Sequence, residues 1–202
     1  MKSLILFGNG GHCKSCIEVI ENTGKYFIKG IIVHPNDFSE KFMGYKVLGN
    51  DENIDENFCK DDLALICIGQ IKSVEKRKRI FKILEDKKIS LATIKSSFSI
   101  ISKRAVIKNG TIVMNNSIVN SNANIGINCI LNTNSLIEHD AVIGDHCHIS
   151  TGAIINGGAN IGNECFVGSG SIIREGVKVG DGSIIGSGQL VMNDLPSNSL
   201  LK

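Results

Sequence analysis

A repeat of six residues runs through the second half of the chain and constrains its fold more than any other feature. From Ser99 to Asp194 the sequence divides into sixteen hexads without an insertion, and the third residue of every hexad is Ile, Val or Leu. The first residue is Ser, Ala, Cys or Thr in fourteen of them. A period of six excludes an α-helix, whose apolar residues recur every 3.6 residues, and predicts a parallel β-helix.

Each hexad predicts one short strand followed by a turn, and three hexads complete one coil of triangular cross-section. The aliphatic third residue points inward and stacks on its equivalents in the neighbouring coils, while the small first residue lies where the wall bends. Glycine, asparagine and aspartate at positions four to six supply the backbone angles of the turns. Sixteen hexads give about five coils, and stacking of this kind buries a continuous core.

Three cysteines recur with the period of a whole coil. Cys129, Cys147 and Cys165 are eighteen residues apart and occupy the first position of their hexads. We expect them to form an internal ladder with a packing role rather than a redox or metal-binding role. The chain has seven cysteines, an odd number that fits a reducing compartment such as the cytoplasm.

Residues 1–96 follow a different pattern, in which apolar strands alternate with amphipathic helices. This alternation predicts a small parallel sheet with a ligand crevice at its strand ends, an α/β domain of the Rossmann type. The β-helix domain then covers residues 97–202. The expected elements are a strand at 2–8, a helix with apolar residues at 13, 16, 17 and 20, strands at 26–34 and 63–69, a basic helix at 73–88 with Val74, Phe81 and Leu84 on one side, and a last strand "LATIK" at 91–95.

Charge and hydropathy argue against some classes of function. The net charge is +2, and the one basic run, residues 72–88, has the spacing of a solvated helix face. Nucleic-acid binding therefore has no electrostatic footprint in the sequence. The apolar start "MKSLILFG" is too short for a signal peptide or a membrane span.

A glycine turn joins the first strand to the first helix. Backbone N–H groups at a helix N-terminus attract anions, and glycines let a phosphate approach closely, so Gly8–Gly11 could form a phosphate cradle. His12 would point into the same crevice. A plain tight turn is the alternative, because the full G-x-G-x-x-G spacing is absent and residues 33–35 include no acid for a ribose.

Three of the five histidines lie within ten residues, beside acidic side chains. His139, His146 and His148 occupy positions five, six and two of consecutive hexads, so they point away from one another and do not favour a zinc site within one chain. His139 stands between Glu138 and Asp140, and one of these carboxylates could hold the imidazole in the tautomer of a general base. From these residues alone, a catalytic His139 and an exposed corner histidine both stay open.

The chain resembles one branch of the hexapeptide-repeat acyltransferases along nearly its whole length. The matching stretches are "LILFGNGGH", "VLGND", "CIGQ", "NTNSLIEHDAVIGDHCHISTGAIINGGANIG", "CFVGSGS" and "SIIGSG". They are similar to the sialic acid O-acetyltransferase (NeuD-type) family, which includes N-acetyltransferases of UDP-linked 4-amino-4,6-dideoxy sugars. The resemblance implies a left-handed β-helix, a homotrimer, acetyl-CoA as co-substrate, no metal, no nucleic acid and no membrane span.

The resemblance also implies roles for individual residues. His139 looks like the general base that acts in direct transfer, and Asp140 looks like the acid that raises its basicity. The Gly157 N–H would polarise the thioester carbonyl. The residues implied to bind acetyl-CoA are His148, Gly157, Ser169 and Ser187, and those implied to bind the sugar substrate are Gly8, Gly10, Gly11, His12, Gly69 and Asn132.

Two departures from the family stand out. Acids that recognise the nucleotide base in some relatives appear here as Val33 and His34, which puts uridine recognition in doubt. The usual Gly-x-Pro-Ala-Lys segment near the end is missing, since the chain ends in "NSLLK", so part of the wall that covers CoA would be absent or the chain truncated.

Several functions stay open at this point. The leading hypothesis is N-acetylation of a UDP-4-amino-4,6-dideoxy sugar in bacterial surface-glycan synthesis, with O-acetylation of a sialic or related nonulosonic acid as the alternative. A non-catalytic trimeric β-helix scaffold belongs to another class. A metal-dependent enzyme of the carbonic anhydrase kind would need histidines that converge between chains.

Overall fold

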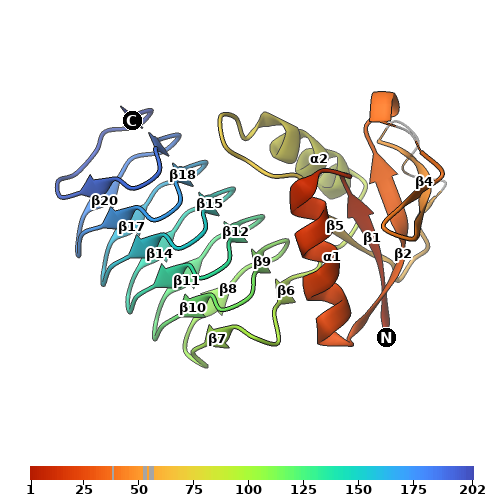
Figure 1. Ribbon diagram of the computed structural model, residues 1–202, viewed down its shortest axis with the longest axis horizontal. Helices are drawn as coiled ribbons and strands as arrows, with labels where there is room; N and C mark the ends of the chain where they lie inside the picture. The colour runs from red at the N-terminus through yellow and green to blue at the C-terminus, as the bar shows by residue number, and fades with distance from the viewer. Residues whose placement is uncertain (38, 52–53, 55–56) are drawn as a thin grey trace. The chain divides into compact units, whose positions relative to one another are not determined.

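The computed structural model describes residues 1–37, 39–51, 54 and 57–202, which form two compact units (Figure 1). The α/β unit comprises Met1–Gly69 and Glu75–Ala92. The β-helix unit comprises Gln70–Val74 and Thr93–Lys202. The short segment Gln70–Val74 thus belongs to the β-helix unit, although the residues on both sides of it in the sequence belong to the α/β unit.

The α/β unit contains the predicted parallel sheet and one additional hairpin. The strand order is β3-β4-β2-β1-β5, with β3 and β4 antiparallel and the other pairs parallel. Met43 and Gly44 both have positive φ and make the turn of the hairpin, which the hydrophobic pattern did not indicate. The elements are β1 Lys2–Phe7, α1 Gly11–Thr23, β2 Tyr26–Val33, the 3₁₀ helix η1 Pro35–Asp37, β3 Lys41–Phe42, β4 Tyr45–Asn50, β5 Leu63–Ile66 and α2 Glu75–Asp86.

Helix α1 has the buried face that its spacing predicts. Cys13, Cys16, Ile17 and Ile20 are all fully buried. The helix ends at Gly24, whose φ of 62° provides the left-handed cap that glycine favours.

Helix α2 differs from the prediction at one residue. Leu84 is buried and Phe81 is half-buried, but Arg77, which falls within the expected solvated face, is 1% exposed. Its Nη1 donates to the carbonyl oxygens of Ile66 at 2.9 Å and Ile68 at 2.6 Å. Both carbonyls lie at or just after the end of β5, so the guanidinium donates to backbone groups that the pattern of α2 alone does not reveal.

The β-helix unit has three walls of short parallel strands, stacked as Figure 1 shows. Partner strands are eighteen residues apart, as in Ile118 opposite Leu136, so three hexads make one coil. The predicted fold class, an α/β subdomain followed by a left-handed parallel β-helix, is confirmed. The first wall contains β7 Ile100–Ile101, β10 Ile118–Val119, β13 Leu136–Ile137, β16 Ile154–Ile155, β19 Ile172–Ile173 and β22 Leu190–Val191; the second contains β8 Val106–Ile107, β11 Asn124–Ile125, β14 Val142–Ile143, β17 Asn160–Ile161 and β20 Lys178–Val179; the third contains β6 Ile94–Lys95, β9 Ile112–Val113, β12 Ile130–Leu131, β15 His148–Ile149, β18 Phe166–Val167, β21 Ile184–Ile185 and β23 Leu200–Leu201.

The core of the β-helix consists of the third-position aliphatics and the small first-position residues. Every third-position residue from Val113 to Val191 is buried. Cys129, Cys147 and Cys165 are fully buried in the same cluster, and burial raises the pKa of the Cys147 thiol. Each thiol donates to a glycine carbonyl of the next coil, namely Gly144 at 3.1 Å, Gly162 at 3.0 Å and Gly180 at 3.3 Å.

The turns share one backbone feature at the sixth position. Every hexad between residues 105 and 188 ends in a residue with φ between 52° and 75°. Half of these residues are glycine, and most of the others are asparagine, with Asp140, His146 and Glu164 as the exceptions. Left-handed backbone favours glycine and short polar side chains, which explains the composition of this position.

The β-helix extends beyond the sixteen hexads at both ends. Ile94–Lys95, expected as the last strand of the α/β sheet, instead pairs with β9. Lys95 stands at the third position, where the repeat has an aliphatic residue, and is exposed at the open end of the stack. In the last coil Ile184 pairs with Leu200, sixteen residues away, so this coil is two residues shorter than the others.

Among the described residues, no helix has the length and the apolar character needed to cross a membrane.

Candidate active site

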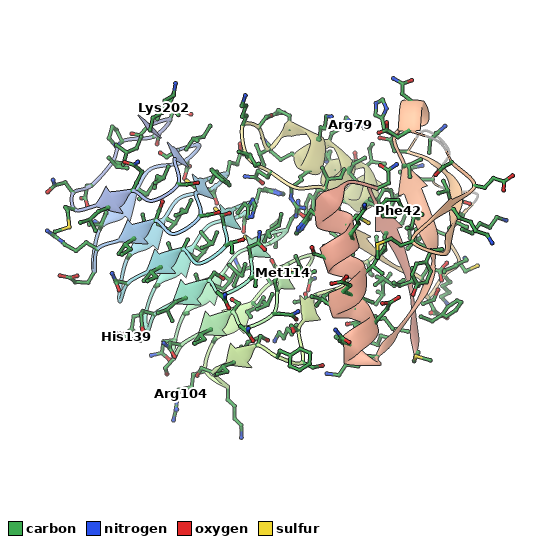
Figure 2. The ribbon with its side chains drawn as sticks, in the orientation of Figure 1. Phe42, Arg79, Arg104, Met114, His139 and Lys202 are labelled. Atoms are coloured by element: carbon green, nitrogen blue, oxygen red, sulfur yellow. The ribbon has the colours of Figure 1, made fainter. Side chains whose placement is uncertain are left out.

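His139 and Asp140 form a pair on the corner after β13, at the outer edge of the β-helix (Figure 2). His139 Nδ1 lies 2.9 Å from Asp140 Oδ2. A carboxylate only accepts, so Nδ1 carries the proton and Nε2 keeps the lone pair of a base. The hydrogen bond from His139, helped by one from Asn122 at 3.2 Å, lowers the pKa of Asp140. Of the two neighbouring carboxylates, the structure selects Asp140 to hold the imidazole.

The other neighbour, Glu138, has separate partners. Its Oε2 accepts from the amide of Asn120 at 2.9 Å and from the backbone N–H of His139 at 3.4 Å. Glu138 therefore fixes the backbone before the histidine instead of the ring.

Gly157 lies directly against the His139 ring, one coil further along. A Cβ atom on Gly157 would be 2.8 Å from both Cε1 and Nε2 of His139, so any larger residue there would push the imidazole out of this position. Among the residues that the structure describes, the N–H of Gly157 has no hydrogen-bond partner. The structure thus brings together three predicted site residues: His139, predicted as the base, Asp140, predicted as its acidic partner, and Gly157, whose N–H is predicted to stabilise an oxyanion.

Asn132 and His148 form a second pair. Asn132 Nδ2 lies 3.2 Å from His148 Nε2, and the histidine is 6% exposed. The two predicted serines lie on the corner after the third wall, where Ser169 Oγ contacts Ser150 Oγ at 2.9 Å and Ser187 is exposed one coil further on. The structure pairs Asn132 with His148 through their side chains, and it pairs His139 with Asp140 and Gly157.

The predicted substrate residues of the α/β unit converge at the carboxyl ends of β1 and β5. Gly8 has φ of 112° and faces Ile68 so closely that a Cβ would lie 2.9 Å from its side chain. Gly10 caps the N-terminus of α1, which Gly11 begins. A Cβ on Gly69 would be 3.6 Å from the His12 Cβ. A glycine turn at a helix N-terminus is a favourable place for a phosphate group.

Two family models match the chain. The PglD N-terminal domain matches residues 3–84, and the bacterial transferase hexapeptide, a model of six repeats, matches residues 158–188. No curated protein sequence matches at a significant level.

Solved structures share the fold over almost the whole chain. The acetyltransferase domain of PglB from Neisseria gonorrhoeae has a TM-score of 0.91 at 23% identity, with 99% of this chain and 96% of that chain covered. PerB from Caulobacter crescentus, solved with CoA and GDP-perosamine, has a TM-score of 0.89 at 25% identity, covering 99% and 93%. WeeI from Acinetobacter baumannii has a TM-score of 0.88 at 21% identity, covering 99% and 96%. Residues 158–188 are thus similar to the hexapeptide-repeat transferases, and the whole chain shares its fold with these three structures.

The corner that holds His139 and Asp140 is open to solvent. The side chains of His139 and Asp140 are 65% and 59% exposed. His146, on a neighbouring corner, uses Nδ1 to contact the Asn128 amide at 3.0 Å. Within the described part of the chain, no three His, Cys, Asp or Glu residues are grouped as a metal ion requires.

Sequence reasoning missed a thiol beside His12. Cys16 Sγ lies 3.4 Å from His12 Nε2, and Cys13 and Cys16 have the Cys-x-x-Cys spacing that could have signalled it. Burial raises the pKa of Cys16, but hydrogen bonds from Cys67 and His12 outweigh burial and, with the charges of His12 and Arg77, bring the pKa to about 5.

Sequence reasoning also missed an acid near the glycine turn. Asp37 follows β2 by a few residues, and its carbonyl oxygen accepts from the Asn9 side chain at 3.2 Å. Residues 33–35 hold no acid, but η1 turns the chain so that Asp37 is tied to the loop after β1.

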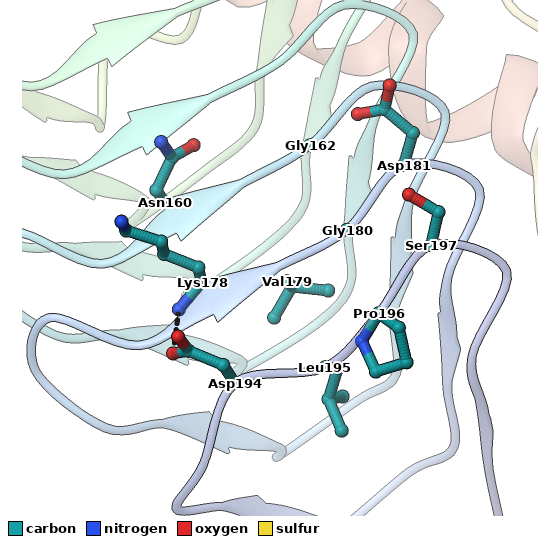
Figure 3. Close-up of a pocket in the computed structure, with 10 residues that line it drawn as sticks. All are labelled: Asn160, Gly162, Lys178, Val179, Gly180, Asp181, Asp194, Leu195, Pro196 and Ser197. Atoms are coloured by element: carbon teal, nitrogen blue, oxygen red, sulfur yellow. Dashed lines mark hydrogen bonds between the residues drawn. The ribbon is translucent and has the colours of Figure 1, made fainter.

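The β-helix unit also has a hollow on its second wall that the sequence did not indicate (Figure 3). Its volume is about 550 Å³. Asn160 and Lys178 project from β17 and β20, and Asp194 accepts from the Lys178 backbone N–H at 2.8 Å. The lining residues are Asn160, Gly162, Lys178, Val179, Gly180, Asp181, Asp194, Leu195, Pro196 and Ser197, none of which is among the predicted site residues.

Proposed function

We propose that the protein transfers the acetyl group of acetyl-CoA to the amino group of a nucleotide-linked sugar. The observation that carries the proposal is the arrangement of His139, with Nδ1 held by Asp140 and Nε2 against Gly157. Support comes from PerB, whose structure holds CoA and GDP-perosamine, and from the acetyltransferase domain of PglB, which was solved with acetyl-coenzyme A.

The proposed mechanism is direct transfer between two bound substrates. His139 Nε2 takes a proton from the acceptor nitrogen as that nitrogen attacks the acetyl carbon, and Asp140 stabilises the imidazolium that results. The N–H of Gly157 donates to the developing oxyanion. The carbon–sulfur bond then breaks, CoA leaves as a thiolate, and the thiolate takes up a proton. Cys147 is buried in the core, so it is not offered as an acetyl carrier.

The α/β unit would bind the sugar nucleotide. The diphosphate would lie at the N-terminus of α1, against the glycine turn from Gly8 to Gly11, where the helix dipole favours negative charge. His12 stands at the same end of the helix. Asp37 would reach the nucleoside, because its loop is tied to the glycine turn through Asn9.

We further propose that the transferase is a homotrimer and that a second copy closes the catalytic corner. The outward-facing second residues of the first wall are all aliphatic, half-buried in the middle and exposed at both ends, whereas those of the second wall include Asn124, Asn160 and Lys178. An exposed aliphatic wall of this length favours an interface between chains. The stripe comprises Ile100, Ile118, Leu136, Ile154, Ile172 and Leu190.

The trimer is tested by charging this stripe. Ile154→Asp should give monomers by sedimentation and lose acetyl transfer, because it places a carboxylate in the proposed interface. Val142→Asp, which puts the same charge on the outward face of the second wall, is the matched control and should leave both properties intact. A trimeric, active Ile154→Asp variant would refute the interface.

The acceptor is tested by thiol release from acetyl-CoA. The panel contains UDP- and GDP-linked 4-amino-4,6-dideoxy sugars, free sialic acid and CMP-sialic acid. Turnover on an amino sugar that is lost in His139→Ala supports the proposal. Turnover on sialic acids alone would move the acceptor to a hydroxyl, and acetyl-CoA binding without turnover on any acceptor would favour the scaffold.

A reducing compartment remains part of the proposal, since all seven cysteines are free thiols.

A further inference from the structure

The β-helix unit carries its charges unevenly along the stack. From residue 93 to residue 137 the sequence has four cations, Lys95, Lys103, Arg104 and Lys108, and no Asp or Glu. From residue 138 to residue 202 it has seven acids and three cations. The first coil is therefore basic and the later coils are acidic, although the net charge of the whole chain is only +2.

All four cations lie on the first coil, residues 93–110, and all four are exposed. Lys95 belongs to β6, Lys103 and Arg104 stand on the corner between β7 and β8, and Lys108 directly follows β8. None of them forms an ion pair with any residue that the structure describes. We call the end of the stack formed by this coil, where Figure 2 labels Arg104, the basic end.

The basic end also leaves apolar surface uncovered. Every third-position residue from Val113 to Val191 is buried, but Ile101 and Ile107 are only half-buried, because β7 and β8 are the last strands of their sheets. On the same coil Phe98 is 60% exposed and Val106 is 54% exposed. The partly uncovered end of the hydrophobic core is thus surrounded by cations.

This combination fits an anionic membrane surface better than it fits other polyanions. Proteins bind the surface of a bilayer when apolar side chains enter the headgroup region and Lys or Arg side chains lie against anionic lipids. A nucleic acid would gain little from exposed aliphatic side chains. An acidic peptide would favour a groove, and the hollow described above lies on later coils, where Asp181 and Asp194 line it beside Lys178.

Cations at the end of a β-stack can have a second role. An edge strand offers backbone groups to another chain, and lysines on such an edge oppose that pairing. This role accounts for the four charges, but it does not account for Phe98 and Val106, whose exposed side chains favour association. The apolar side chains are therefore the observation that favours a lipid partner.

We propose that the basic end binds the surface of an anionic lipid bilayer, with Phe98 and Val106 in the headgroup region and the four cations against the lipid phosphates. The proposal is independent of the proposed function, because no substrate takes part in it. It is also compatible with the proposed trimer, because the basic end faces along the stack, whereas the trimer would bury the first wall.

Vesicle sedimentation tests the charges. The full chain should bind vesicles of phosphatidylcholine and phosphatidylglycerol in equal parts, should bind phosphatidylcholine alone weakly, and should lose most of its binding at high salt. Each cation removed should weaken binding about fivefold, so Lys103→Gln combined with Arg104→Gln should bind about 25-fold more weakly. Arg174→Gln combined with Lys178→Gln removes the same charge from later coils and should bind like the wild type. All four side chains are exposed, so thermal unfolding should stay unchanged in both double variants.

Fluorescence tests the apolar side chains. The chain has no tryptophan, so Phe98→Trp provides a single reporter at the basic end. Met192→Trp, at an exposed position near the other end of the stack, is the matched control. With the mixed vesicles, the emission of the Phe98→Trp variant should shift to shorter wavelength and be quenched by brominated lipid, and that of the Met192→Trp variant should not.

Three results would overturn the proposal: equal binding to the two kinds of vesicle, an equal loss of binding in the two double variants, or no quenching of the Phe98→Trp variant. Self-association of the variant that lacks Lys103 and Arg104, together with no vesicle binding by the wild type, would assign the cations to protection of the edge strands. Tighter binding to poly-glutamate than to the mixed vesicles would assign the basic end to an acidic protein and would likewise overturn the proposal.

Discussion

Two corners of the same β-helix differ in the hydrogen bonds made by the backbone N–H groups at position five of their hexads. On the corner after the second wall, the position-five side chains form a ladder: Ile127 N–H donates to Asp145 Oδ1 at 2.9 Å, Asp145 N–H to Asn163 Oδ1 at 2.8 Å, and Asn163 N–H to Asp181 Oδ1 at 2.7 Å. On the corner after the first wall, position five holds His139 and then Gly157, and the Gly157 N–H has no partner among the described residues. One corner uses its N–H groups for structure, and the other leaves an N–H for a ligand.

The residues at position four explain how the ladder closes. Gly126, Gly144 and Gly162 precede the ladder residues, and a Cβ on any of them would lie within 3 Å of the next coil. The first-wall corner instead has side chains at this position, such as Glu138, which orders the backbone before His139. The corner proposed to be catalytic therefore differs from the other corner in lacking this ladder, while both belong to the same coils.

The largest expected effect comes from removing the base. His139→Gln should lower kcat by about 10² to 10⁴ without unfolding the protein, since the side chain is exposed and no core contact is lost. Acetyl-CoA turnover and thermal unfolding measure the two properties. His146→Gln, on the second-wall corner, should stay active, and a similar loss in both variants would contradict the distinction between the corners.

A smaller loss is expected from filling the space beside the base. Gly157→Ala keeps the N–H but puts a methyl group where the His139 ring lies, so the imidazole must move and kcat should fall by about 10². Glu175→Ala, at the same position one coil further on, should change kcat little. A crystal structure of Gly157→Ala with an unmoved ring would show that this explanation is wrong.

A still smaller loss is expected at Asp140. Asp140→Asn removes the acceptor that fixes the tautomer, and because the pair is exposed we expect kcat to fall by roughly tenfold. In the wild type the lowered pKa of Asp140 keeps the carboxylate ionised at neutral pH, and its support of His139 is lost only as the pH falls through that lowered pKa. Pre-steady-state rates against pH, compared between the two proteins, test this.

The smallest effect on catalysis is expected in the ladder. Asn163→Ala leaves the Asp145 N–H without its acceptor and should lower the free energy of unfolding by about 1 kcal/mol, while kcat stays unchanged. Denaturant unfolding and turnover at a low temperature measure the two quantities. A large loss of kcat would mean that the ladder also supports the site.

Most of the fold could be predicted from the six-residue repeat, because an aliphatic residue at the third position of every hexad indicates a buried side chain there. The prediction failed at the ends of the stack, where Lys95 can stand in a third position since the coil there is open to solvent. Arg77 was assigned to the solvent face because it is a charged residue within a basic helical run. The sequence pattern of the helix gives no sign that the carbonyl oxygens of Ile66 and Ile68 lie within reach of its guanidinium.

The candidate site was predictable as a set of residues but not as a set of contacts. The residue pattern alone could not choose between Glu138 and Asp140 as the partner of His139, because both are adjacent to it; only the family resemblance implied Asp140. The bond of His148 to Gln70 joins residues 78 positions apart and leaves no periodic signal. The roles of these residues stay predictions until the variants are measured.

The left-handed turn at the sixth position has a consequence for how such proteins acquire new chemistry. Asp140 occupies a place where the backbone already prefers glycine or a short polar side chain, so an acid there fits the turn that the coil requires anyway. Asn122 holds the same place one coil earlier, directly after Ser121. Replacing Ser121 by histidine and Asn122 by aspartate would place the same two side chains one coil earlier, but His139 would then occupy the place that Gly157 holds beside the original ring, so a working copy would also need a glycine at position 139.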